Sequence, residues 1–190
     1  MFDFTPSVNQ CTAKILSPVL KFLYLKCKLT PNRISILSFT IGSISVILIL
    51  FKNLKLGLLF LLAALIFDVL DGAVARYFKL ETKQGKILEL IFDRTNEASL
   101  FLAIAYVNLV DFKTTILAIV AILLMTTIKD KSKFDPGCKR IMLFVGYLLH
   151  NFKLALEITF FVNLFSFILS MLIIEYKNQK KIDCQSRTCG

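Results

Sequence analysis

Acidic residues interrupt the most apolar part of this sequence at helical intervals, and this feature constrains the fold more than any other. The apolar run from Leu56 to Phe67 leads directly into Asp68 and Asp71. These two residues share one face of a helix because they are three positions apart. Further along, Glu89 and Asp93 are four positions apart and lie on a second helical stripe. Two antiparallel helices would therefore bring these carboxylates together.

A cluster of carboxylates in so small a space requires cations. Like charges at close range disfavour ionisation of one another, whereas a bound cation removes that repulsion. Hard divalent ions prefer oxygen ligands. The sequence therefore predicts a Mg²⁺ or Mn²⁺ site with Asp68, Asp71, Glu89 and Asp93 as its ligands.

The composition predicts an integral membrane protein. The chain has 190 residues, of which 56% are hydrophobic, and its mean hydropathy is +0.72. We predict an all-α bundle of six transmembrane helices in one domain over residues 1–190, preceded by an amphipathic surface helix over residues 1–29. Thr30 is expected to cap the first span, with Pro31 at its first helical position. The predicted spans are residues 32–51, 56–78, 84–110, 114–128, 138–150 and 153–175, and residues 176–190 are expected to form a mobile polar tail.

Basic residues predict the orientation in the membrane. With six spans, 18 of the 23 Lys and Arg residues fall on the side that holds both termini. This asymmetry places both termini, and the carboxylate cluster with them, on the cytoplasmic side of a multi-pass protein of the cell membrane. Membrane lipids account for the net charge of +10, so we expect no nucleic-acid partner.

Small and basic residues beside the carboxylates suggest phosphate chemistry. Gly72 and Gly85 lack side chains, which lets a ligand or a neighbouring helix approach the backbone. Arg76 supplies positive charge for a phosphate group. Together with metal ions, these residues favour phosphoryl-group transfer involving a lipid or nucleotide.

Two functions of other classes compete with this interpretation. Acidic residues inside membrane spans also mark ion paths, so an ion-coupled transporter is one alternative. Against it, the acids gather at one end of two spans, and the chain has no visible inverted repeat. A catalytically silent membrane scaffold is the other alternative.

The spacing of these residues resembles the signature of the CDP-alcohol phosphotransferase family. That signature is D-x2-D-G-x2-A-R, then eight residues, then G-x3-D-x3-D. This chain has Asp68-x2-Asp71-Gly72-x2-Ala75-Arg76, eight residues, and then Gly85-x3-Glu89-x3-Asp93. Every spacing matches, and Glu89 is the one departure because the family has aspartate there. The Thr30-Pro31-Asn32 segment is also similar to the family.

The resemblance implies a reaction and a role for each matched residue. A CDP-linked donor, usually a lipid, would bind with its diphosphate on two metal ions, an acceptor hydroxyl would attack the β-phosphorus, and CMP would leave. Asp93 would be both a metal ligand and the general base. Asp68 and Glu89 would each bridge the two metals and Asp71 would bind one of them; the Glu89 side chain is one methylene longer than the aspartate of the family. The residues that would contact the CDP portion are Pro31, Asn32, Gly72, Arg76, Thr82 and Gly85.

The acceptor is less well defined than the donor. The segments around Arg94 and Lys139-Arg140 are similar to archaeal and bacterial members that make phosphatidylinositol phosphate or archaetidylinositol phosphate. These three residues would form a cationic pocket for myo-inositol phosphate, although Lys139 and Arg140 also suit plain anchoring at the cytoplasmic surface. Glycerol phosphate, serine, unphosphorylated inositol or another alcohol stays open as the acceptor, and an inactive member of the family is a further alternative. The resemblance also suggests a homodimer.

Overall fold

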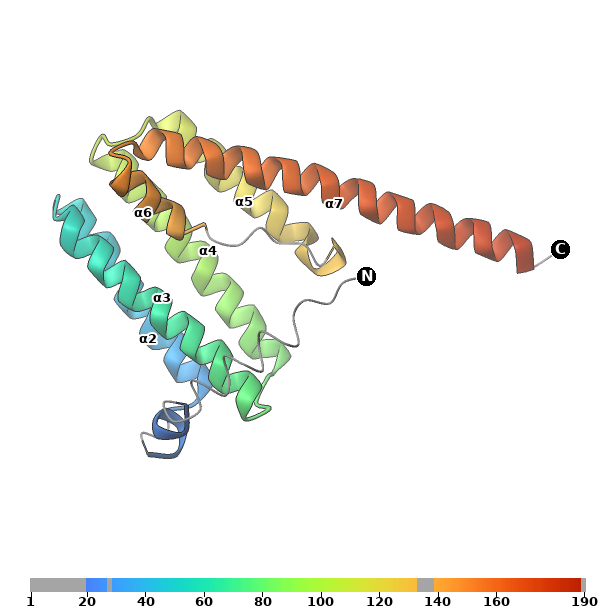
Figure 1. Cartoon of the computed structure of the whole chain (residues 1–190), viewed down its shortest axis with the longest axis horizontal. Helices are drawn as coiled ribbons and strands as arrows, with labels where there is room; N and C mark the ends of the chain where they lie inside the picture. Colours follow the sequence, from blue (N-terminus) through green and yellow to red (C-terminus); the bar gives the residue numbers. More distant parts are fainter. Residues whose placement is uncertain (1–19, 27–28, 133–138, 189–190) are drawn as a thin grey trace. The chain divides into compact units, whose positions relative to one another are not determined.

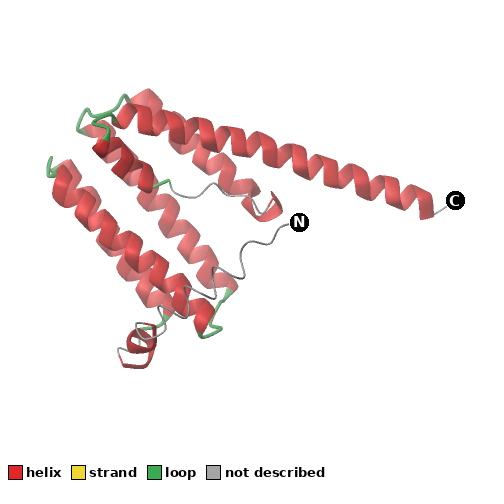
Figure 2. Ribbon diagram, viewed as in Figure 1, coloured by secondary structure: helices red, strands yellow, loops and turns green. Residues whose placement is uncertain are grey.

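The computed structural model describes residues 20–26, 29–132 and 139–188, and within them every regular element is a helix (Figures 1 and 2). The prediction of an all-α chain is confirmed for this part. Most of the predicted surface helix over residues 1–29 lies outside the described residues; the described part includes a short π-helix, η1. The elements are η1 (Phe22–Lys26), α2 (Pro31–Leu50), α3 (Leu54–Tyr77), α4 (Lys83–Tyr106), α5 (Phe112–Ser132), α6 (Ile141–Leu148) and α7 (Phe152–Thr188).

The chain divides into two compact units, residues 1–99 and residues 100–190. In the first unit, α2 and α3 form a helical hairpin because only three residues connect them. Polar groups tie the two helices closely: Ser38 Oγ donates to the carbonyl of Ala64 at 2.8 Å, and Ser45 Oγ donates to the carbonyl of Gly57 at 2.7 Å. In an apolar setting such bonds satisfy hydroxyl groups that would otherwise be costly to bury.

An apolar cluster fixes the end of α3 that carries the acidic motif. Leu20, Ile34 and Val74 are almost fully buried against one another. Tyr24 packs on Phe78 with 4.2 Å between the ring centroids. This cluster holds the start of α2 next to the end of α3, because Ile34 and Val74 belong to these two helices.

In the second unit, α7 packs against α5 and α6. Gly146 permits close contact between α6 and α7, since a Cβ there would lie 3.0 Å from the Cβ of Ala155. Buried polar side chains along α7 bond to carbonyls one turn earlier: Thr159 Oγ1 donates to Ala155 O, and Asn163 Nδ2 donates to Thr159 O. Such bonds keep polar groups satisfied inside an apolar helix.

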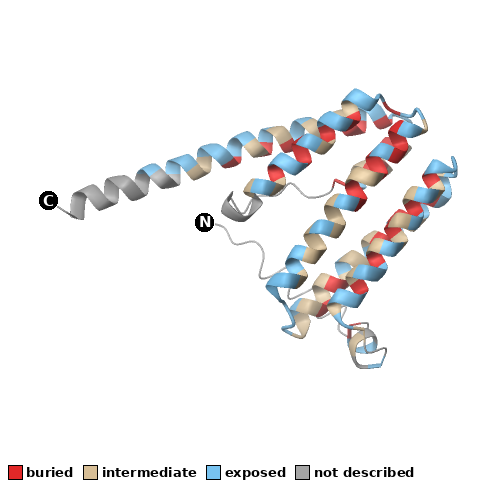
Figure 3. Ribbon diagram, turned by 180° about the vertical axis from the view of Figure 1, so that it is seen from behind, coloured by how far each residue is buried: buried red, intermediate tan, exposed pale blue. Residues whose placement is uncertain are grey.

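Three described helices are long and apolar enough to cross a membrane: Pro31–Leu50, Leu54–Tyr77 and Phe152–Tyr176. Many of their large apolar side chains are exposed, among them Ile47, Leu59 and Phe165 (Figure 3). Exposed apolar side chains on long helices suit contact with lipid, so the chain is a membrane protein.

The predicted helix boundaries are close to the observed ones, and the last helix extends further than predicted. Thr30 occupies the N-cap position of α2 with Pro31 as the first helical residue, as predicted, although the Thr30 side chain makes no capping bond. The polar tail predicted over residues 176–190 is helical up to Thr188, because α7 continues to that residue. No Gly or Pro interrupts residues 176–188, and Lys and Gln in this stretch favour helix.

Candidate active site

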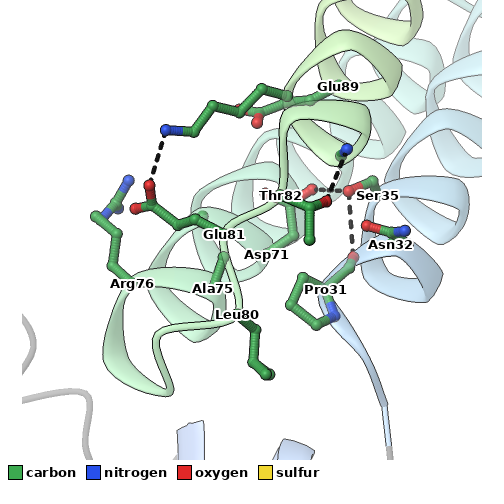
Figure 4. A pocket seen from close by; sticks show the side chains of 13 residues that line it. Pro31, Asn32, Ser35, Asp71, Ala75, Arg76, Leu80, Glu81, Thr82 and Glu89 are labelled. Carbon is green, nitrogen blue, oxygen red and sulfur yellow. Dashed lines mark hydrogen bonds and ion pairs between the residues drawn. The ribbon is translucent and has the colours of Figure 1, made fainter.

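One pocket in the first unit collects most of the predicted site residues (Figure 4). It lies among the first turns of α2, the last turns of α3 and the start of α4, and we call it the α3–α4 pocket. Eight sequence-predicted site residues line it: Pro31, Asn32, Asp71, Gly72, Arg76, Thr82, Gly85 and Glu89. Ser35, Ala75, Leu80, Glu81 and Lys86 complete the lining. All six residues predicted to contact the CDP portion therefore belong to one concave surface.

A reversal of the chain after α3 brings the loop to the pocket. Lys79 adopts a left-handed backbone with φ of 54°. The N–H of Leu80 then donates to the carbonyl of Ala75 at 2.8 Å, which satisfies a carbonyl at the end of the helix. Glu81 and Thr82 follow at once and line the pocket.

Thr82 lies directly before α4 and lines the pocket, so α4 begins at the pocket. The Thr82 hydroxyl accepts a hydrogen bond from the N–H of Gly85 at 3.0 Å, and its carbonyl accepts one from the N–H of Lys86 at 3.1 Å. Thr82 is thus the N-cap of α4. The partial positive charge of a helix N-terminus favours bound anions, which suits a phosphate in this pocket.

The two motif glycines make room for side chains of the pocket. A Cβ on Gly85 would lie 3.0 Å from Thr82 Oγ1 and 3.2 Å from Asn32 Oδ1. A Cβ on Gly72 would lie 3.2 Å from Nη1 of Arg76, so the guanidinium group lies across this glycine. Any larger residue would displace a polar group that faces the pocket.

Asp71 is the most enclosed acid of the pocket, with 3% of its surface exposed. Ser35 Oγ donates a hydrogen bond to Asp71 Oδ2 at 2.6 Å. The other oxygen, Oδ1, is buried and has no hydrogen-bond partner within the described part of the chain. The negative charges of Glu89 and Asp93 act on this carboxylate. A buried carboxylate oxygen without a donor, beside other carboxylates, fits a cation ligand.

Two of the predicted metal ligands do not line the pocket. Asp68 on α3 and Asp93 on α4 are not among the residues that line the pocket, although the charge of Asp93 acts on Asp71. Among the described residues, no three His, Cys, Asp or Glu side chains gather into a group that would hold a metal ion. The donor chemistry nevertheless fits Mg²⁺ or Mn²⁺, because every candidate ligand offers oxygen atoms.

The predicted acceptor residues are buried or paired. Arg94 Nη1 lies 2.7 Å from Oε2 of Glu97 on the same helix, and both side chains are largely buried. Lys139 and Arg140 are buried just before α6 in the second unit. The assignment of these three residues to an acceptor phosphate stays a prediction.

Sequence reasoning missed three polar residues of the pocket: Ser35, Glu81 and Lys86. Lys86 Nζ and Glu81 Oε2 are 2.8 Å apart and form an ion pair. Spacing offered one usable signal, because Ser35 follows Pro31 by four residues and thus shares its helix face. Glu81 and Lys86 carried no such signal.

Comparison with known proteins agrees with the motif. Residues 28–173 match the model of the CDP-alcohol phosphatidyltransferase family. The chain is 24% identical over 151 residues to the archaetidylinositol phosphate synthase of Pyrococcus horikoshii, which covers 74% of this chain and 80% of that protein.

The fold is also similar to that of solved structures. The phosphatidylinositol phosphate synthase of Mycobacterium tuberculosis with CDP-DAG bound has a TM-score of 0.64 at 20% identity, covering 86% of this chain and 92% of that one. The same enzyme in complex with manganese and citrate has a TM-score of 0.63 at 20% identity, covering 84% and 86%. At this identity the likeness concerns the fold. Since the family model spans most of the sequence and all three helices of the pocket, the chain belongs to the CDP-alcohol phosphatidyltransferase family.

Proposed function

We propose that this chain makes an inositol phospholipid by transferring a substituted phosphate from a CDP-linked lipid to myo-inositol phosphate, with release of CMP. The family establishes the coarser part: the chain is a transferase of phospholipid synthesis that uses a CDP-linked donor and an alcohol. One observation carries the assignment to this chain's own residues. All six predicted donor contacts line the α3–α4 pocket together with Asp71 and Glu89.

The pocket offers complementary groups to a nucleoside diphosphate. The Arg76 guanidinium and the first turn of α4 favour the phosphates. Asn32 and the Thr82 hydroxyl can donate hydrogen bonds to the nucleotide. Gly72 and Gly85 leave space for it beside the helix backbones.

Asp68, Asp71, Glu89 and Asp93 would hold two divalent ions, Mg²⁺ or Mn²⁺. When bound, such ions neutralise the charge that develops on the transferring phosphoryl group. Ser35 orients Asp71 through its 2.6 Å hydrogen bond. The structure of a relative in complex with manganese supports a divalent ion, although that complex belongs to the relative.

Asp93 would accept the proton of the acceptor hydroxyl. The acceptor oxygen then bonds to the β-phosphorus as the bond from that phosphorus to the CMP oxygen breaks. The donor lipid keeps its phosphate, which now links it to the acceptor. Asp93 returns its proton to water.

Two lines of support favour an inositol phosphate as the acceptor. Both kinds of relative named above are inositol-lipid phosphate synthases by their names. Arg94, Lys139 and Arg140 would supply positive charge to the acceptor's phosphate. Glycerol phosphate, serine or another alcohol is the alternative.

We further propose six membrane spans, with both termini and the active site at the cytoplasmic side of the cell membrane. The Lys and Arg distribution supports this topology. The proposal includes one domain over residues 1–190, an amphipathic segment over residues 1–29 and a homodimer.

The test is CMP release by the purified protein in lipid. The assay contains Mg²⁺ or Mn²⁺, an ester-linked or ether-linked CDP-lipid, and myo-inositol phosphate, with an acceptor-free control. We expect release that requires both metal and acceptor, and its loss in Asp93→Asn. Release with glycerol phosphate or serine in place of myo-inositol phosphate would overturn the acceptor assignment and keep the reaction class. No release with any acceptor would contradict the proposed function for this chain.

A further inference from the structure

An ion pair stands at the rim of the α3–α4 pocket. Lys86 Nζ and Glu81 Oε2 lie 2.8 Å apart, and both residues line the pocket. Glu81 belongs to the loop after α3, whereas Lys86 belongs to the first turns of α4; Figure 4 draws their contact as a dashed line. The Lys86 side chain is 66% exposed and that of Glu81 is 42% exposed, so both charges are open to water and to an entering ligand.

Glu81 is an unexpected residue in a pocket that takes a diphosphate. Asp71 and Glu89 have a function there as metal ligands, but Glu81 lies outside the motif that supplies those ligands. Its carboxylate would repel phosphate oxygens, since like charges at short range repel. Lys86 has the opposite character and would attract them. At the pocket rim, Lys86 therefore favours binding of the donor and Glu81 opposes it, and the two side chains form an ion pair with each other.

Lys86 can change partners at little cost. An exposed Lys–Glu pair is only weakly favourable, because water screens the two charges and two flexible side chains must be held in one geometry. The ammonium group has three donors on a long stem, and it can move to a neighbouring acceptor. A diphosphate carries more than one negative charge, so it competes well with a single carboxylate for this ammonium.

We propose that Glu81 and Lys86 form an exchangeable clasp: Lys86 is held by Glu81 in the free protein and turns to the diphosphate of the CDP-linked donor when the donor binds. Lys86 is then a donor-binding residue, and Glu81 lowers donor affinity by competing for it. This inference rests on the proposed function, because it requires that the α3–α4 pocket binds a CDP-linked donor.

Three single variants test the clasp in the full chain: Lys86→Gln, Glu81→Gln and, as the matched control, Lys83→Gln. Lys83 is an exposed lysine on the same first turn of α4 that does not line the pocket. The readouts are KM for the CDP-lipid and kcat in the CMP-release assay, together with CDP binding measured by calorimetry. We expect Lys86→Gln to raise KM and weaken CDP binding about three- to tenfold, Glu81→Gln to lower KM about two- to fivefold, and Lys83→Gln to match the wild type.

The double variant Glu81→Gln/Lys86→Gln separates exchange from simple charge. If Lys86 exchanges partners, Glu81→Gln raises the affinity for the CDP-linked donor because it releases Lys86. Glu81→Gln should therefore have little effect on donor affinity when Lys86 is already replaced by Gln. If Glu81→Gln raised donor affinity equally in the wild type and in Lys86→Gln, the exchange would be overturned, because Glu81 would then act by its own charge alone. Equal effects of Lys86→Gln and Lys83→Gln would overturn the role of Lys86, while wild-type CMP release would leave the proposed function intact. Absence of CMP release in the wild type would instead count against the proposed function itself.

Discussion

Ser35 on α2 donates a hydrogen bond of 2.6 Å to Oδ2 of Asp71 on α3, and this bond joins two helices at the base of the α3–α4 pocket. It occupies one oxygen of the carboxylate and leaves the buried Oδ1 without a hydrogen bond in the described part of the chain. The hydroxyl also lies 3.2 Å from the carbonyl of Pro31. In the proposed metal site, Ser35 would therefore set which oxygen of Asp71 is presented to a cation.

Ser35→Ala should weaken metal binding. Without the hydroxyl, the Asp71 carboxylate loses its orientation, and residues that orient metal ligands typically affect affinity by about tenfold or more. We expect the Mn²⁺ concentration for half-maximal activity to rise about tenfold. Thermal unfolding in detergent, followed as Mn²⁺ is added, should show the same shift without any substrate.

Two further serine variants control this experiment. Ser35→Thr keeps a hydroxyl and should restore most of the metal affinity. Ser43→Ala removes another α2 hydroxyl, one that donates to Phe39 O and has no link to Asp71, and it should leave the metal dependence unchanged. If Ser35→Ala and Ser43→Ala gave the same Mn²⁺ midpoint, Ser35 would have no role in orienting Asp71.

Gly85→Ala should separate activity from stability. Alanine favours a helix by about 1 kcal/mol over glycine, so the variant should unfold at a temperature close to that of the wild type or above it. The new Cβ would lie 3.0 Å from Thr82 Oγ1 and 3.2 Å from Asn32 Oδ1, and would push both polar groups from their places. We expect KM for the CDP-lipid to rise about tenfold or more, since small displacements in a site cost that much. A stable variant with unchanged KM would exclude Asn32 and Thr82 as donor contacts.

Gly42→Ala should destabilise the first unit. Gly42 on α2 faces Asn96 on α4, and a Cβ at this position would collide with the Asn96 amide nitrogen. Asn96 is 4% exposed, so it has little room to move aside. Overpacking of this kind costs about 1–3 kcal/mol. Thermal unfolding in detergent measures it, and Gly42→Ala/Asn96→Ala should regain stability; a double variant less stable than Gly42→Ala would contradict this contact.

The positions of the helices could be predicted from the sequence, because apolar runs and the residues that end helices are local signals. The span predicted over residues 84–110 is the helix Lys83–Tyr106 in the structure. It ends earlier because Asn108 adopts a left-handed backbone with φ of 61°, and its N–H bonds to the carbonyl of Ala105. Asparagine tolerates this conformation better than most residues, so the signal was present in the sequence. The π-helix at Phe22–Lys26 had no comparable signal.

The pocket could be predicted only as far as helical spacing reaches. Gly72 and Arg76 are four positions apart and share a helix face, so spacing alone places them together. Ser35 reaches Asp71 across 36 positions of sequence, which depends on how α2 packs against α3. Glu81 reaches Lys86 because of the left-handed turn at Lys79. Such contacts depend on tertiary packing and loop geometry, which periodicity does not encode.

Glu89 is where this chain departs from the aspartate of the family signature, and substitutions there test whether its charge or its length matters. Glu89 lines the pocket and acts electrostatically on Asp71, so its carboxylate belongs to the site as it stands. We expect Glu89→Gln to reduce CMP release at least about a hundredfold, because the amide keeps the shape of the proposed metal ligand and removes its charge. Glu89→Asp should retain activity with a changed preference between Mg²⁺ and Mn²⁺, since the carboxylate is kept but withdrawn by one methylene. Metal titrations of CMP release for both variants provide the measurement. Lys153→Gln is the control, because Lys153 pairs with Asp111 at 2.9 Å in the second unit and does not line the α3–α4 pocket. Activity in Glu89→Asp far above an inactive wild type would instead identify the native glutamate as the cause of a silent site.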